Sequence, residues 1–119
     1  YPLILDIEGL GVSRASIVEA LEAEGVTGLV SGYANIHTLP MYQNKIAYGS
    51  GGFPWTSEVC RRNVEYGKGI CPVAEDLHNS TFIGLELCLH EMSDNDISLV
   101  ISAFIKVWNN INSLKAKSL

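Results

Sequence analysis

Apolar residues gather in three short runs of the chain, and each run predicts a β-strand. Residues 3–7 are rich in branched side chains, and a second apolar run covers residues 26–33. In the third run, residues 81–89, apolar side chains recur at every second position with one interruption at Ile83. We therefore expect three strands.

Two longer segments place apolar residues at helical spacing. The first, residues 14–24, lies between Ser13, which can cap a helix, and Gly25, which can end one. The second begins at Ser93, which forms a capping-box pattern with Asp96. Its apolar positions are Ile97, Val100, Ile101, Phe104, Trp108 and Ile111. Both patterns predict amphipathic helices.

A third, shorter helix is predicted from Pro72 to about Asn79, because proline favours the first helical position. Glu75 and Asp76 then lie in its first turn, where the helix dipole favours negative charge. Adjacent residues on a helix point apart, so we do not interpret these two carboxylates as an acid/base pair.

The segment 34–71 shows no clear periodicity. It combines aromatic residues, glycines and prolines, a mixture suited to irregular packing rather than to a disordered linker. We interpret it as a long ordered loop that packs on a surface absent from this chain. From the length we expect residues 1–119 to form a single domain of the α+β class, in which helices pack on one face of a small, mostly antiparallel sheet.

Charge and composition exclude several classes of protein. Thirteen acidic and eight basic residues give a net charge of −5, and no basic cluster marks a nucleic-acid partner. The apolar runs are shorter than the ~20 residues of a membrane-spanning helix, so no membrane association is expected. Three irregularly spaced cysteines fit free thiols in the cytoplasm better than disulfides, and their spacing favours no metal site.

Four segments of the chain together resemble one protein family. They read Gly-Tyr-Ala-Asn-Ile-His-Thr-Leu-Pro-Met-Tyr over 32–42, Pro-Val-Ala-Glu-Asp-Leu over 72–77, Phe-Ile-Gly-Leu-Glu-Leu over 82–87, and Ser-Asp-Asn-Asp-Ile over 93–97. This order resembles the C-terminal small domain of the DegT/StrS family of sugar aminotransferases, fold-type I enzymes that depend on pyridoxal phosphate. In the first segment, Gly32 and Asn35 depart from the His and Pro usual in the family.

The resemblance implies a substrate-binding role for Tyr33, His37 and Tyr42, whose places match the family's loop beside the acceptor. An imidazole between two tyrosines can bind sugar hydroxyls or phosphate oxygens. The residue chemistry alone also allows His37 to be a loop histidine bonded to backbone, and both tyrosines to be packing anchors. Among the arginines, Arg14, Arg61 and Arg62 are either carboxylate or diphosphate clamps or members of surface ion pairs.

The same resemblance implies an enzyme that moves an amino group, typically from glutamate, to a keto-sugar or cyclitol that is often nucleotide-linked. The chain begins at Tyr1 within a predicted strand, without a leader, so we expect a truncated or excised domain of a longer protein. In the family the lysine that binds pyridoxal phosphate belongs to the preceding large domain of the same chain, and the enzyme works as a homodimer. We expect no catalytic or cofactor-binding residue in this chain and no activity of the fragment alone.

Two other interpretations stay open. The chain could be a stand-alone module that binds a metabolite or mediates dimerisation, since a β-α-β start suits both tasks. It could also belong to a non-catalytic regulatory relative of the aminotransferases. An upstream domain with a Schiff-base lysine would distinguish the enzyme from both.

Overall fold

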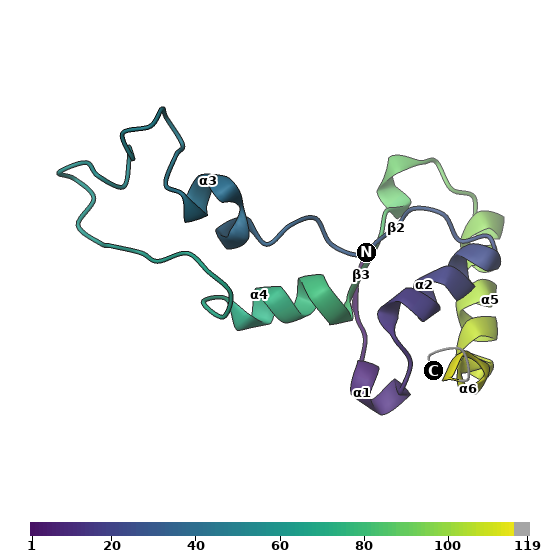
Figure 1. Ribbon diagram of the computed structural model, residues 1–119. Helices are drawn as coiled ribbons and strands as arrows, with labels where there is room; N and C mark the ends of the chain where they lie inside the picture. Colours follow the sequence, from purple (N-terminus) through teal and green to yellow (C-terminus); the bar gives the residue numbers. More distant parts are fainter. Residues whose placement is uncertain (116–119) are drawn as a thin grey trace. The chain divides into compact units, whose positions relative to one another are not determined.

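The structure is a computed structural model that describes residues 1–115 (Figure 1). The length predicts one domain, and contacts divide the described chain into two compact units. Unit 1 consists of residues 1–32 and the described residues from 79 onward, and unit 2 is Tyr33–His78. Unit 2 therefore contains the whole segment 34–71. No helix in residues 1–115 is long and apolar enough to cross a membrane.

Unit 1 contains a three-stranded antiparallel sheet in the order β1-β3-β2, so the predicted α+β class is confirmed. The strands are β1 (Pro2–Ile4), β2 (Leu29–Val30) and β3 (Phe82–Leu85). Leu3 pairs with Ile83 and Leu29 with Leu85, which places these four side chains on one face. Ile4 lies on the other face and is 71% exposed.

All three strands are shorter than predicted, and local backbone features explain why. The first strand ends early because Asp6 caps helix α1 (Ile7–Leu10), its carboxylate accepting the Gly9 amide proton at 2.9 Å. The second is confined by Gly28 and Gly32, whose φ angles of 73° and 109° interrupt an extended backbone. The third strand ends at Leu85, because the chain then turns into the 3₁₀ turn η3 (Leu87–Leu89).

The two long helices are confirmed at their predicted starts. Ser13 caps α2 (Arg14–Ala23), and Ser93 with Asp96 forms a complete capping box at α5 (Asp94–Asn109). Gly25 adopts a φ of 89° after α2, and the Val26 amide bonds the Leu21 carbonyl at 3.0 Å, as in a Schellman motif. A short helix, α6 (Ile111–Lys115), follows α5.

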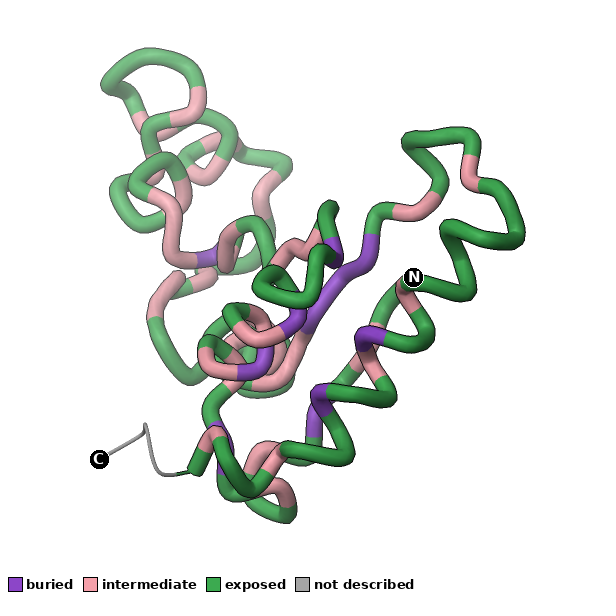
Figure 2. Tube along the Cα trace, turned by 90° about the vertical axis from the view of Figure 1, so that its right-hand side faces the viewer, coloured by how far each residue is buried: buried purple, intermediate pink, exposed green. Residues whose placement is uncertain are grey.

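Helices α2 and α5 pack against each other and supply much of the unit 1 core. The buried positions in Figure 2 follow β3 and the inner sides of these helices. The buried apolar residues are Leu5, Val12, Ile17, Leu21, Val26, Ile83, Leu85, Ala103 and Val107. Because Ile83 and Leu85 belong to this core while Ile4 is exposed, the helices cover one face of the sheet, as predicted.

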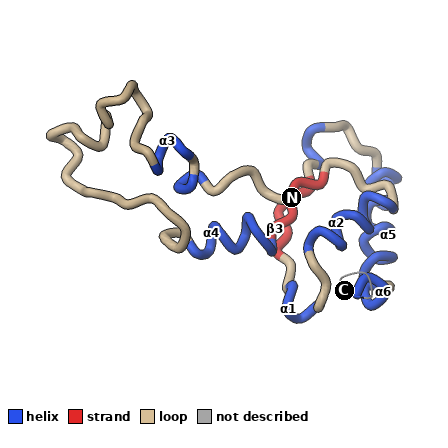
Figure 3. The backbone as a smooth tube through the Cα atoms, in the orientation of Figure 1, coloured by secondary structure: helices blue, strands red, loops and turns tan. Residues whose placement is uncertain are grey.

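Unit 2 is mostly irregular, as Figure 3 shows. It contains the 3₁₀ turn η1 (Ile36–Thr38) and two short helices, α3 (Pro40–Gln43) and α4 (Pro72–Asp76). Proline begins both short helices, as expected for the first helical position. The predicted helix from Pro72 is present, and a π-helical turn, η2 (Leu77–Thr81), follows it where the sequence predicts an end near Asn79.

Candidate functional site

His37 is the one buried polar residue of the described chain, with 9% of its surface exposed. Its Nε2 lies 2.9 Å from Oε1 of Glu75, and the Gly69 amide donates to the same oxygen at 2.7 Å. The imidazole therefore bonds a carboxylate, which neither sequence interpretation anticipates. The contact ties η1 to the loop before α4 and to α4 itself.

Glu75 is a partner of His37 that the sequence does not reveal. Its place in the first turn of α4 is as predicted, and its backbone amide bonds the Cys71 carbonyl at 2.9 Å. Its side chain is also the acceptor for Gly69 and His37. The Gly69 amide, and then the His37 imidazole, hold the pKa of Glu75 below its ordinary value because both stabilise the ionised carboxylate.

Tyr42 belongs to an aromatic cluster, the Tyr42 cluster, which also contains Trp55 and Tyr66. The ring centroid of Tyr42 lies 6.1 Å from that of Trp55 and 5.4 Å from that of Tyr66. Trp55 donates its indole proton to the Tyr66 hydroxyl oxygen at 3.0 Å. Edge-on and tilted rings at these distances attract each other, so the cluster holds together three segments of unit 2.

Tyr33 differs from both, because it is 96% exposed. Within residues 1–115, no hydrogen bond or ring contact of the structure joins Tyr33, His37 and Tyr42 to one another. The three predicted residues thus share unit 2 but lie in three environments: Tyr33 has an exposed ring, His37 is buried and hydrogen-bonded to Glu75, and Tyr42 belongs to an aromatic cluster. Of the three, Tyr33 alone presents its whole side chain to solvent.

Arg14 has a role that no sequence signal indicated. Its guanidinium donates to the carbonyl oxygens of Ser31 at 3.0 Å, Phe82 at 3.2 Å and Asn79 at 3.1 Å. Ser31 and Asn79 lie close to the points where the chain leaves and re-enters unit 1. Arg14 therefore holds these two points of unit 1 to the start of α2.

Two of the described lysines, Lys45 and Lys106, can be compared with the amine that pyridoxal phosphate requires. Such a site needs a lysine, an acidic partner for the ring nitrogen and a phosphate-binding cup. Lys45 bonds Asn63 and Glu65, at 3.0 and 3.3 Å, and Lys106 bonds an oxygen of Glu24 at 2.6 Å. Both are therefore engaged in ordinary polar contacts. Residues 1–115 also contain no group of three or more side chains arranged to hold a metal ion.

Comparison of the chain with protein-family models, with curated proteins and with solved structures found no match. The family resemblance therefore depends on the sequence segments quoted above.

Proposed function

We propose that this chain is the small domain of a pyridoxal phosphate-dependent sugar aminotransferase of the DegT/StrS type. The observation that carries the proposal is the character of unit 2. Its only buried residue is His37, while it exposes many large apolar side chains: Tyr33, Ile36, Met41, Ile46, Tyr48, Phe53, Val59, Ile70 and Val73. Such an exposed apolar surface is typical of a region that contacts another domain and a substrate.

The contributions of the three predicted residues follow from their environments. Tyr33 offers an exposed phenol that can donate a hydrogen bond to an acceptor sugar. His37 acts as a positioning residue, since its Nε2 bonds Glu75 and orders the turn that follows Tyr33. Tyr42 supports this surface through its ring contacts with Trp55 and Tyr66.

The cofactor belongs, on this proposal, to a large domain of the same longer chain. Pyridoxal phosphate supplies the electron sink for amino transfer when bound there. The amino donor is an amino acid, with glutamate as the expected one, and the acceptor is a keto-sugar or cyclitol, often nucleotide-linked. The small domain binds and orients the acceptor, the whole enzyme is a homodimer, and the fragment alone is inactive.

An absorbance spectrum of the protein expressed from its full reading frame tests the proposal. After purification with pyridoxal phosphate, we expect a visible cofactor band that glutamate bleaches. A reading frame that encodes only these residues, or a product without the band, would instead support a stand-alone binding or dimerisation module. A bound cofactor that no amino donor bleaches would indicate the non-catalytic relative.

A further inference from the structure

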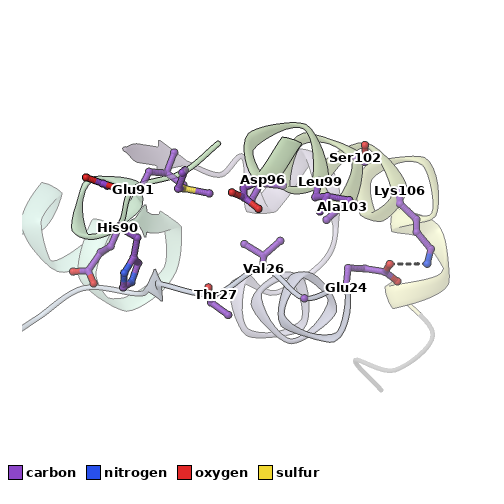
Figure 4. A pocket seen from close by; sticks show the side chains of 15 residues that line it. Glu24, Val26, Thr27, His90, Glu91, Asp96, Leu99, Ser102, Ala103 and Lys106 are labelled. Atoms are coloured by element: carbon purple, nitrogen blue, oxygen red, sulfur yellow. Dashed lines mark hydrogen bonds and ion pairs between the residues drawn. The ribbon is translucent and has the colours of Figure 1, made fainter. Parts of the chain in front are cut away.

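A groove of about 650 Å³ runs along one side of α5 in unit 1 (Figure 4). Its walls are the turn 24–27, the segment 86–92 and α5 itself. The apolar part of its surface is lined by Val26, Leu87, Met92, Leu99, Val100 and Ala103. Leu99 is 62% exposed, so a large aliphatic side chain is accessible at the rim.

The groove also carries four carboxylates, from Glu24, Glu86, Glu91 and Asp96. Its one lysine, Lys106, already bonds Glu24 at 2.6 Å, and Figure 4 shows this pair at one end of the groove. Among the described residues no ion pair reaches the other three carboxylates. His90, on the same wall, is the remaining titratable group. The groove therefore combines an apolar surface with uncompensated negative charge.

Asp96 is a fixed part of this charge. Its Oδ2 accepts both the amide proton of Ser93, at 2.9 Å, and the Ser93 hydroxyl, at 2.7 Å. These bonds hold the pKa of Asp96 below its ordinary value, so the carboxylate stays ionised. In Figure 4 the side chain extends from α5 towards Val26. A cationic group arriving there meets a carboxylate whose rotamer is already restricted, which lowers the entropic cost of pairing.

We propose that this groove binds a protein segment in which aliphatic side chains alternate with lysine or arginine. The aliphatic side chains would bury the apolar surface, and the cations would pair with Glu86, Glu91 and Asp96. A neutral apolar occupant would desolvate these carboxylates without pairing them, which is costly. A second copy of this chain is disfavoured because each copy carries a net charge of −5. The proposal does not depend on the aminotransferase function.

Binding of a short fluorescent peptide of alternating leucine and lysine, followed by anisotropy, tests the proposal. We expect saturable binding to the full chain that weakens as salt is added. The double variant Glu86→Gln/Glu91→Gln should weaken binding about tenfold or more, as two lost charge pairs imply. Leu99→Ser should also weaken it, and because Leu99 is largely exposed, the variant should remain folded.

The matched control is the double variant Glu8→Gln/Glu19→Gln, which changes the net charge equally at exposed positions outside the groove. Its affinity for the peptide should equal that of the unchanged protein. In the unchanged protein, the amide resonances of Val26 and Ala103 should shift when the peptide binds. Equal losses in both double variants would mean unspecific charge attraction and would overturn the proposal. Equal binding of a leucine–glutamate peptide, absence of binding, or self-association through the groove would overturn it as well.

Discussion

Units 1 and 2 of this chain are built on different physical principles. Every buried apolar residue of the described chain lies in unit 1, where α2, α5 and β3 share one core. Unit 2 buries only His37 and is held by the His37–Glu75 pair, the Tyr42 cluster and the Lys45 contacts with Asn63 and Glu65. Burial of apolar area is non-directional and tolerates substitution, whereas ion pairs and ring contacts depend on particular side chains.

The two units should therefore differ in how easily they unfold. Unit 1 should resist unfolding as one cooperative block, whereas unit 2, with few buried apolar contacts, should open at lower cost. The chain contains two tryptophans, Trp55 in unit 2 and Trp108 in unit 1. The variants Trp108→Phe and Trp55→Phe therefore leave one fluorescent reporter in each unit, so that each unit can be followed separately.

The largest effect is expected from Ile17→Ala, which removes a fully buried side chain from the unit 1 core. Loss of burial together with the cavity that remains should reduce the free energy of unfolding by about 2–5 kcal/mol. Urea denaturation followed at Trp108 measures the change. The matched control is Ile101→Ala, at a helical position that is 52% exposed, where a change within about 0.5 kcal/mol is expected. Similar losses in both variants would refute a core confined to the buried face of α5 and α2.

Arg14→Lys should have the next largest effect, because lysine cannot donate in three fixed directions to the carbonyls of Ser31, Phe82 and Asn79. We expect a loss of about 1.5–3 kcal/mol, the range for hydrogen bonds to charged groups. Faster hydrogen exchange in strand β3 should accompany it. Arg61→Lys, at an exposed position of unit 2, is the control and should change nothing measurable. Unchanged stability in Arg14→Lys would mean that other contacts hold unit 1 together at Ser31 and Asn79.

The elements of unit 1 that the sequence predicted best are those with local signals. Helices α2 and α5 carry both an apolar face and a capping residue, so their starts at Arg14 and Asp94 follow from neighbouring residues. Strand lengths were overestimated because apolar runs do not report backbone angles. The positive φ values of Gly28, before β2, and of Gly32, after it, limit the strand on both sides although the neighbouring side chains suit a strand.

The candidate site was predictable only in part, because its contacts join residues distant in the sequence. His37 and Glu75 are separated by 38 positions, and the helix dipole already accounted for a glutamate at the start of α4. Arg14 bonds backbone carbonyls, which every residue has, so no side-chain pattern marks its partners. A buried histidine in a unit that buries no other residue is a signal that only a structure provides.

Acid should destabilise unit 2 through Glu75. The Gly69 amide and the His37 imidazole lower the pKa of Glu75 from its ordinary value of 4.5, so the folded state favours the ionised form more than the unfolded state does. This stabilisation is complete above pH 4.5 and is lost as the pH falls through the lower folded-state pKa. Trp55 fluorescence of Trp108→Phe, titrated with acid, measures the loss.

The variant Glu75→Gln should remove this acid-dependent step and loosen unit 2 already at neutral pH. Glu58→Gln, at an exposed position in the same unit, is the control and should keep the step. An acid transition that is the same in Glu75→Gln and in the unchanged protein would show that another carboxylate of unit 2 is responsible.

The smallest effect on stability is expected from Tyr33→Phe, which removes only a hydroxyl from a side chain that is 96% exposed. Urea denaturation should be unchanged within about 0.5 kcal/mol, since exposed positions seldom affect folding. If the proposed aminotransferase function is correct, the same substitution in the full-length protein should raise the KM for the sugar acceptor and leave the half-reaction with the amino donor unaffected. His37→Ala, by contrast, should alter both acceptor kinetics and the stability of unit 2, because it also breaks the Glu75 pair. If acceptor kinetics do not change in Tyr33→Phe, Tyr33 does not contribute to the acceptor site that we propose.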